Sequence, residues 1–186
     1  SEKDLFFCKG QRDCKSGWFL YDVSIVLKNH EISEEKYCPY FENPFTCSES
    51  CHPYSLYNID DFYYINNFNE MKHWLFRNGT LLTRMNVYRD LFQYDGGIYE
   101  KNSDIFIGGH AIAVVGYDDA EGYWICKNSW GKSWGEDGFF RIKYGESGIM
   151  PYAYGYKVSN IPEPYVTNRG NIKLPSIILY LLLIIH

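Results

Sequence analysis

Two stretches decide the fold of this chain: Gly-Gly-His-Ala-Ile-Ala-Val-Val-Gly-Tyr at 108–117 and Tyr-Trp-Ile-Cys-Lys-Asn-Ser-Trp-Gly at 123–131. Both contain short apolar runs bounded by glycine, which predicts strands over 111–117 and 123–127. His110 directly precedes the first strand, where its imidazole can project into a cleft, and Asn128 directly follows the second. A lone histidine in this position is usually structural, and the second sequence is what favours a functional pair.

The remaining elements follow from the spacing of apolar residues. Apolar residues near helical spacing predict a helix over 18–30, and a shorter helix is expected over 69–78 with Gly79 as its C-cap. Strands are predicted over 81–87 and 139–143, separated by glycine-rich turns. A helical first part followed by a run of strands indicates an α+β protein with two lobes.

Composition excludes several classes of protein. Hydrophobic residues make up 46% of the chain and aromatic residues 19%, which is too much for a disordered segment. The formal net charge is −5, and lysine and arginine form no cluster. The sequence therefore lacks the electrostatic footprint of a nucleic-acid-binding protein.

The second sequence continues as Trp-Gly-Glu-Asp-Gly-Phe-Phe at 134–140, and together the two resemble the histidine and asparagine signatures of papain-like cysteine proteases. The spacing of 18 residues from His110 to Asn128 also suits that family. The resemblance implies an α+β papain-like two-lobe fold, of which the chain holds part of the helical lobe and the complete β-rich lobe. It also implies a cysteine-type endopeptidase that uses no cofactor and no metal.

In such enzymes a histidine activates a cysteine, because a thiol at its ordinary pKa is mostly protonated at neutral pH. The resemblance gives this role to His110, which would form a thiolate–imidazolium pair and later protonate the leaving amine. Asn128 would accept a hydrogen bond from the far ring nitrogen and orient the imidazole. Trp130 would shield that hydrogen bond from water and line the cleft.

The resemblance also suggests residues that contact the substrate. The sequence Cys-Lys-Ser-Gly-Trp at 14–18 is similar to the family's Cys-Asn-Gly-Gly motif, whose glycines let an extended peptide pair with the enzyme backbone. The segment 86–99 looks most like the cathepsin B branch. Arg84 or Met85 would stand at the wall of the pocket for a hydrophobic P2 side chain, and Tyr152 at its base. Core packing is the alternative for Met85 and Tyr152. The substrate-binding residues that the resemblance implies are Ser16, Gly17, Met85, Gly109, Trp130 and Tyr152.

The family's nucleophile lies in a Gln-x-x-x-x-x-Cys-Trp segment, whose glutamine side chain and cysteine amide form the oxyanion hole. The 186 residues contain no such segment. Without a nucleophile and an oxyanion hole the covalent mechanism cannot run. We therefore expect this chain to be the C-terminal part of an active protease and to be inactive alone. The alternative is a catalytically inactive papain-fold protein that binds peptides or partners.

Five of the six cysteines fall in the first 51 residues, among polar and turn-forming residues, which predicts a disulfide framework made in an oxidising compartment. A zinc site at 47–52 is the less favoured alternative, because no second pair follows at metal-site spacing. Cys126 is expected to be a buried free thiol. The resemblance leads us to expect the pairs Cys8–Cys47 and Cys38–Cys51, with Cys14 left over.

The C-terminal residues differ in character from the rest. We expect a peptidase domain over 1–160, a polar linker over 161–173 and a hydrophobic tail over 174–186. The tail offers about half of the ~20 apolar residues that a spanning helix requires. We expect that the tail attaches the protein to a membrane. The alternative is a hydrophobic C-terminus that packs on the protein itself.

The sequence also bears on the compartment and the partners of the protein. Asn78-Gly79-Thr80 is an N-glycosylation sequon, which is consistent with secretory traffic. We expect a lysosome- or vacuole-like compartment or an extracellular location. The expected partners are peptide and protein substrates, a propeptide and cystatin-like inhibitors.

Overall fold

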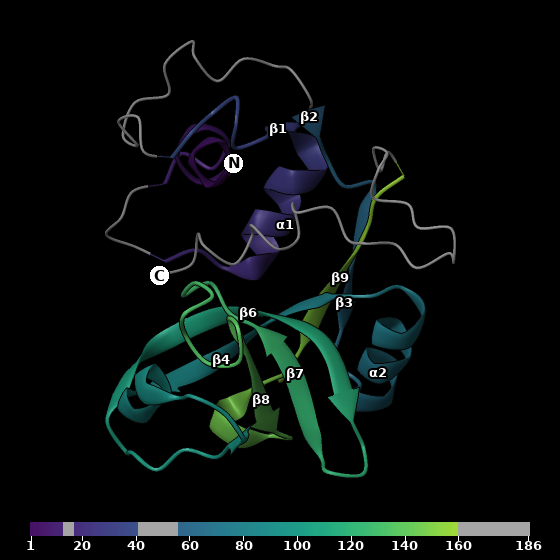
Figure 1. Ribbon diagram of the computed structural model, residues 1–186. Helices are drawn as coiled ribbons and strands as arrows, with labels where there is room; N and C mark the ends of the chain where they lie inside the picture. The colour runs from purple at the N-terminus through teal and green to yellow at the C-terminus, as the bar shows by residue number, and fades with distance from the viewer. Residues whose placement is uncertain (13–16, 41–55, 160–186) are drawn as a thin grey trace. The chain divides into compact units, whose positions relative to one another are not determined.

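The computed structural model describes residues 1–12, 17–40 and 56–159, and the chain divides into two compact units. Of the described residues, the first unit comprises those within 1–62 and 156–159, and the second comprises 63–155. Figure 1 labels α1, α2 and the strands other than β5. The predicted α+β class is confirmed, because helices dominate the first unit and a large sheet dominates the second.

Among its described residues the first unit contains one α-helix, which confirms the helix predicted over 18–30. This helix forms because Leu20, Val23 and Leu27 recur at helical spacing, and all three side chains are buried. The elements of the unit are the π-helix η1 (Asp4–Lys9), α1 (Leu20–Asn29), and β1 (Ile32–Ser33) paired antiparallel with β2 (Leu56–Tyr57).

Two cysteines of the first unit take part in disulfides. Cys8 and Cys38 are both disulfide-bonded. Their expected partners, the left-over Cys14 and the alternative zinc site at 47–52 lie outside the described residues, so the pairing stays a prediction. In the second unit Cys126 is a fully buried free thiol, as predicted.

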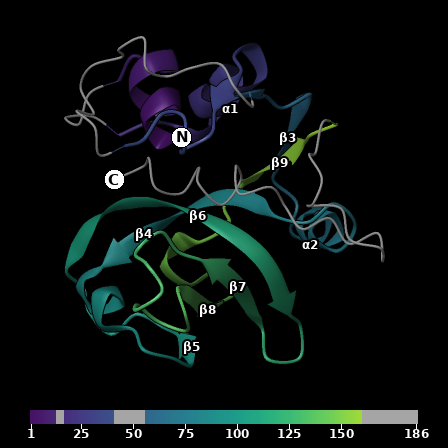
Figure 2. The same cartoon turned by 45° about the horizontal axis from the view of Figure 1, so that its top comes forward.

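The second unit is built on a sheet whose strands are hydrogen-bonded in the order β3-β9-β4-β6-β7-β8-β5. Neighbours from β9 to β8 pair antiparallel, and β5 joins β8 in parallel. Figure 2 shows β6, β7 and β8 side by side. The strands are β3 (Asp61–Ile65), β4 (Leu81–Tyr88), β5 (Ile98–Tyr99), β6 (Phe106–Asp118), β7 (Tyr123–Lys127), β8 (Phe139–Lys143) and β9 (Ala153–Lys157). The helices are α2 (Phe68–Arg77) and the 3-10 helices η2 (Arg89–Gln93) and η3 (Glu146–Gly148).

The strands predicted over 123–127 and 139–143 are confirmed as β7 and β8, and those over 81–87 and 111–117 are parts of the longer β4 and β6. The sequence did not predict β3, β5 and β9. Four consecutive residues of β9 are buried, so this strand lacks the alternation of buried and exposed positions that marks a strand in a sequence.

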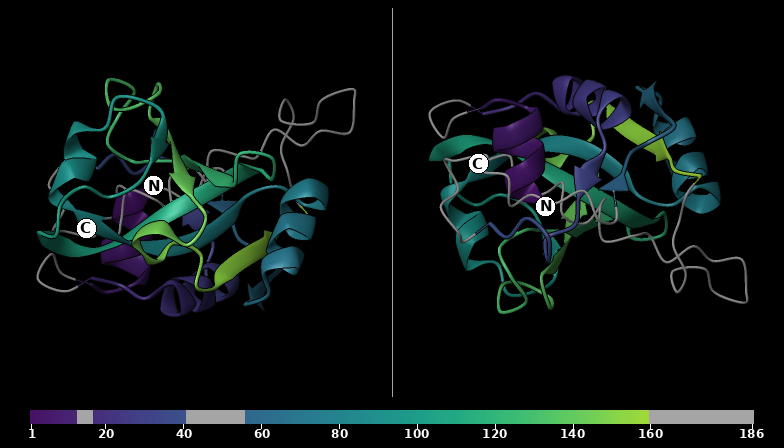
Figure 3. Two further views of the ribbon diagram at one scale, coloured as in Figure 1. Left: turned by 90° about the horizontal axis from the view of Figure 1, so that it is seen from below. Right: turned by 90° about the horizontal axis from the view of Figure 1, so that it is seen from above.

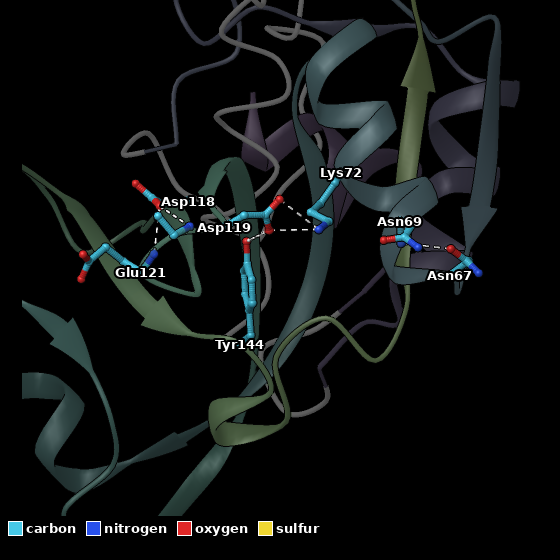
Figure 4. Close-up of polar contacts among 8 residues, drawn as sticks. Asn67, Asn69, Lys72, Asp118, Asp119, Glu121 and Tyr144 are labelled. Atoms are coloured by element: carbon cyan, nitrogen blue, oxygen red, sulfur yellow. Dashed lines mark hydrogen bonds and ion pairs between the residues drawn. The ribbon is translucent and has the colours of Figure 1, made fainter.

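The start of α2 confirms the helix predicted over 69–78. The side-chain oxygen of Asn67 accepts a hydrogen bond from the backbone N–H of Asn69 at 3.0 Å (Figure 4). It also accepts one from the backbone N–H of Glu70 at 3.1 Å. An asparagine in this position satisfies N–H groups that the helix itself cannot. The helix therefore begins where its capping residue places it.

The end of α2 differs by one residue from the prediction. Asn78, and not Gly79, occupies the C-cap, and its backbone N–H donates to the carbonyl oxygen of Trp74 at 2.7 Å. Gly79 follows with a φ of 94°, in the left-handed region that glycine adopts without strain. The predicted C-cap glycine is thus the residue that turns the chain from α2 into β4.

α2 packs on the sheet through one face. Met71 and Leu75 are buried, and Lys72 reaches Asp119 in the turn after β6, where Nζ and Oδ1 lie 2.9 Å apart. The hydroxyl of Tyr144 donates to the same carboxylate oxygen at 3.0 Å, as Figure 4 shows. This carboxylate therefore links α2 to the segment that follows β8.

α2 also lies alongside β9, as both views in Figure 3 show. The contact depends on Gly155, because a Cβ atom there would lie 2.2 Å from the indole of Trp74. Within the residues that the structure describes, no helix combines the length and the apolar character needed to cross a bilayer. The expected hydrophobic tail at 174–186 lies outside them.

Candidate active site

The two residues that the sequence singled out lie together in the second unit. His110 Nε2 and Asn128 Oδ1 are 2.9 Å apart. Ala113 of β6 is the register partner of Lys127 of β7, so antiparallel pairing continued by one residue sets Asn128 opposite Ile112. Because side chains two residues apart share a face of a strand, His110 and Asn128 meet on that face.

The hydrogen bond between the two side chains has a defined direction. The backbone N–H of Ser129 also donates to Asn128 Oδ1, at 2.8 Å, which identifies this atom as the carboxamide oxygen. Since an oxygen of this kind can only accept, the proton of the bond belongs to His110 Nε2. The neutral imidazole then carries its lone pair on Nδ1, the nitrogen that a base would use.

Both side chains are buried. His110 is 4% exposed and Asn128 is 3% exposed. The backbone N–H of Asn128 donates to the carbonyl oxygen of Gly138 at 2.9 Å, which holds the residue in place after β7 ends. A hydrogen bond shielded from water in this way is electrostatically stronger than one in solvent, so the imidazole is held in one orientation.

An aromatic stack covers the imidazole. Trp130 stacks on His110 with ring centroids 5.3 Å apart, and Phe92 of η2 stacks on Trp130 at 4.8 Å with an interplanar angle of 8°. Trp134 meets Trp130 edge to face at 5.0 Å. Trp130 therefore lies over the imidazole, while its expected role in lining the cleft stays a prediction. Phe92 was missed, although it stands as an exposed aromatic residue directly after the fully buried Leu91.

Polar contacts fix the loop that carries Trp130. The indole N–H of Trp134 donates to the carbonyl oxygen of Leu91 at 3.2 Å, which ties the loop to η2. Glu136 accepts from the guanidinium of Arg141 and from the backbone N–H of Gly97. The Arg141 guanidinium holds the pKa of the Glu136 carboxyl below its ordinary value. These contacts fix the loop that carries Trp130 and so hold the aromatic stack in position.

The predicted substrate-binding residues fall into different surroundings. Gly109 is exposed next to His110, and a Cβ atom added there would meet no atom within 4 Å. Gly17 is exposed in the first unit and has similarly open surroundings. Ser16 lies outside the described residues. Of the described members of the set, Gly109 precedes His110 in β6, Trp130 stacks on its imidazole, and Met85 is its register partner on β4.

The two predicted pocket residues differ from each other. Met85 has no exposed surface and lies in the core, whereas its neighbour Arg84 is exposed on the other face of β4. Core packing, the alternative for Met85, is what its burial favours. Tyr152 is partly exposed and its ring stacks on Tyr64 with centroids 5.6 Å apart. The hydroxyl of Thr83 donates to the Tyr152 carbonyl oxygen, which anchors the backbone there.

The described residues offer no group of three or more histidine, cysteine, aspartate or glutamate side chains that could hold a metal ion. Cys126 is the free cysteine among them, and its complete burial raises the pKa of the thiol well above the ordinary value. Cys8 and Cys38 are disulfide-bonded. None of these three sulfur atoms can therefore serve as a thiolate nucleophile next to His110.

Several known proteins are similar in sequence to this chain. The chain is 31% identical over 146 residues to macrodontain-1 from Ananas macrodontes, covering 77% of this chain and 67% of that protein. It is 30% identical over 177 residues to cathepsin B-like protease 1 from Arabidopsis thaliana, covering 80% of this chain and 46% of that protein. Against cathepsin B-like CP3 from Giardia intestinalis it is 51% identical over 67 residues, which are 34% of this chain and 22% of that protein. The chain spans about half the length of the curated relatives it matches.

The structure also has known neighbours. The solved structure of proCathepsin B S9 from Trypanosoma congolense matches with a TM-score of 0.73 and 27% identity, covering 86% of this chain and 60% of that one. The family model described as papain family cysteine protease matches residues 1–157. The fold is therefore the papain-like α+β fold, and the chain belongs to the papain family of cysteine proteases.

Proposed function

We propose that the full protein is a papain-like cysteine endopeptidase that hydrolyses peptide bonds through a Cys-His-Asn mechanism. The observation that carries this proposal is the buried hydrogen bond from His110 Nε2 to Asn128 Oδ1, in which the N–H of Ser129 identifies the acceptor. This arrangement prepares the imidazole to act as a base at Nδ1. Membership of the papain family supports the same activity.

The proposed mechanism follows from that proton arrangement. His110 Nδ1 takes the proton of the nucleophilic thiol, and the thiolate attacks the carbonyl carbon of the peptide bond. The imidazolium then gives this proton to the leaving amine, and water hydrolyses the thioester. Asn128 accepts from Nε2–H throughout, so the ring keeps its orientation while Nδ1 loses and regains the proton.

The nucleophile is part of the proposal. The printed sequence holds no Gln-x-x-x-x-x-Cys-Trp segment, and the described cysteines are bridged or fully buried. We propose that residues outside this sequence supply the cysteine and the oxyanion-hole donors, and that the 186 residues alone do not cleave peptides. Residues 1–160 would then form the peptidase domain, with a linker at 161–173 and the tail at 174–186 as a membrane attachment.

The proposal extends to the substrate and the partners. Gly109 leaves the backbone beside His110 open, which lets an extended peptide approach, and Trp130 lines one side of that approach. Ser16, Gly17 and Tyr152 would contact residues of the peptide farther from the scissile bond. The solved neighbours from Trypanosoma congolense and Tenebrio molitor are named as proenzymes, which supports a propeptide as a partner, alongside cystatin-like inhibitors. The disulfide-bonded Cys8 and Cys38 support a secretory, lysosome-like or extracellular location.

Covalent trapping tests the function. The full protein is incubated with a tagged epoxide inhibitor of thiol proteases, and the adduct is measured by mass spectrometry. We expect one adduct on a cysteine in the wild type, and labelling of His110→Ala slower by about 10²-fold or more, because the base is lost. His73→Ala, which changes an exposed histidine of α2, is the matched control and should label like the wild type. An unlabelled wild type would instead support a papain-fold binding protein without catalysis.

A further inference from the structure

One sequence motif plays no part in the proposed mechanism. Asn78-Gly79-Thr80 is the one Asn-x-Ser/Thr sequence in the 186 residues. The structure places it where α2 ends and the chain turns into β4. The surroundings of these three residues therefore show whether Asn78 has room for an attached glycan.

Asn78 presents its side chain to solvent. The residue is exposed, and its side-chain amide has no hydrogen-bond partner among the residues that the structure describes. α2 faces the sheet with Met71 and Leu75, while Phe76 on the outer side is 82% exposed. A large group on the Asn78 amide nitrogen thus extends into solvent and displaces no packed side chain.

Thr80 has the opposite environment. It is 3% exposed, because β4 enters the sheet directly after it. An enzyme that transfers an oligosaccharide to this motif must reach the threonine hydroxyl as well as the asparagine amide. In the folded protein the enzyme cannot reach the buried hydroxyl. The oligosaccharide therefore has to be transferred before β4 is incorporated into the sheet.

We propose that Asn78 carries an N-linked glycan, which is added while the chain is still unfolded in the secretory pathway. The donor is a polyprenyl-diphosphate-linked oligosaccharide. A bond forms between Asn78 Nδ2 and the first sugar carbon, the bond from that carbon to the diphosphate oxygen breaks, and the polyprenyl diphosphate leaves. The amide nitrogen gives up one proton in the exchange. Passage through the secretory pathway is supported by the disulfide-bonded Cys8 and Cys38.

The glycan lies far from the catalytic pair along the sheet. Leu81 at the start of β4 pairs with Val114, and Met85 pairs with His110. These two register positions are four residues apart, or about 13 Å along the strand. Asn78 stands three residues before Leu81, on the side away from His110. The glycan therefore leaves the reaction unchanged, which separates this proposal from the proposed peptidase activity.

The test is made on the full protein secreted from a eukaryotic host that performs N-glycosylation. We expect peptide N-glycosidase to increase the gel mobility of the wild type by one step, and Asn78→Gln to run at the faster position without treatment. Asn69→Gln alters an exposed asparagine of the same helix that lies outside any sequon, and it should retain the shift. Thr80→Ser keeps the motif and should retain it as well. Equal mobility of wild type and Asn78→Gln, treated or not, overturns the proposal.

A second measurement separates glycosylation from spontaneous loss of the amide, to which Asn-Gly sequences are prone. Glycosidase treatment in heavy-oxygen water converts glycosylated Asn78 into aspartate that carries the heavy isotope. We expect that label on residue 78 only when the glycosidase is present, whereas unlabelled aspartate, intact asparagine throughout, or equal labelling without the enzyme overturns the proposal. To test the timing, folded protein made without glycan is incubated with microsomes and the lipid-linked donor. It should stay unmodified, and modification at Asn78 would show that folding does not bar the transfer.

Discussion

His110 Nε2 lies 2.9 Å from Asn128 Oδ1, although 18 residues separate the two in sequence. The side chains meet because β6 and β7 are antiparallel neighbours. His110 directly precedes the apolar run of β6, and Asn128 directly follows that of β7. The Ser129 N–H shares the same acceptor, so the asparagine holds two donors at once. Replacing either side chain therefore has consequences that can be measured separately.

We expect Asn128→Ala to leave the imidazole and the Ser129 N–H without their shared acceptor. Unsatisfied buried donors cost about 1–3 kcal/mol, so urea denaturation should show a loss of stability in that range. In the full protein kcat/KM for a peptide substrate should fall by about 10- to 100-fold, because the ring loses its orientation. Asn102→Ala, at an exposed asparagine, serves as the control for both measurements. An unchanged kcat/KM would contradict the orienting role.

Phe92→Ala should loosen the stack on Trp130. A stacked aromatic pair contributes about 0.5–1.5 kcal/mol beyond its buried area, so we expect a loss of this size in unfolding free energy. Near-UV circular dichroism should report greater freedom of the indole. Phe92→Tyr keeps a ring of the same shape and should restore both signals. If the alanine variant has the wild-type spectrum, Phe92 does not hold Trp130.

Gly155→Ala should destabilise the second unit, because the added Cβ would lie 2.2 Å from the Trp74 indole. Overpacking of this kind typically costs about 1–3 kcal/mol, which thermal or urea unfolding would measure. Gly108→Ala is the matched control, since a Cβ atom there meets no atom within 4 Å. A variant as stable as the control would mean that α2 can move away from β9 at little cost.

Stability should depend on pH through Glu2. Burial, and then its hydrogen bond to Glu35, raise the pKa of the Glu2 carboxyl from 4.5 to about 7, although a backbone hydrogen bond lowers it in part. The folded chain then keeps a proton that the unfolded chain has lost, so stability is highest below pH 4.5 and decreases up to about pH 7. Urea midpoints across this range should fall less steeply for Glu2→Gln than for the wild type. Glu31→Gln, at an exposed position, should follow the wild type, and parallel curves for all three would refute the role of Glu2.

The sequence alone determined the elements whose signal is local. The apolar runs of β7 and β8, the helical spacing of α1 and the glycine after α2 were all visible in short windows, and they predicted four strands and two helices correctly in type. The histidine and asparagine signatures likewise identified the family, because their residue types and spacing are set by the chemistry they serve. The boundaries of the predicted elements were less exact, since β6 begins five residues before its predicted start and the C-cap of α2 is Asn78 rather than Gly79.

Tertiary structure decided what depends on distant partners. β9 is a strand because it pairs with β4. Both of its faces are buried, so its sequence lacks the alternation of apolar and polar residues that predicts a strand. Met85 is buried and Arg84 is exposed because their side chains lie on opposite faces of β4. The sequence of this strand does not show which of its faces packs against the core. The stack of Phe92 on Trp130 joins segments far apart in the chain. The proton position on His110 follows from the Ser129 N–H, since only a second donor at the shared oxygen identifies which atom accepts.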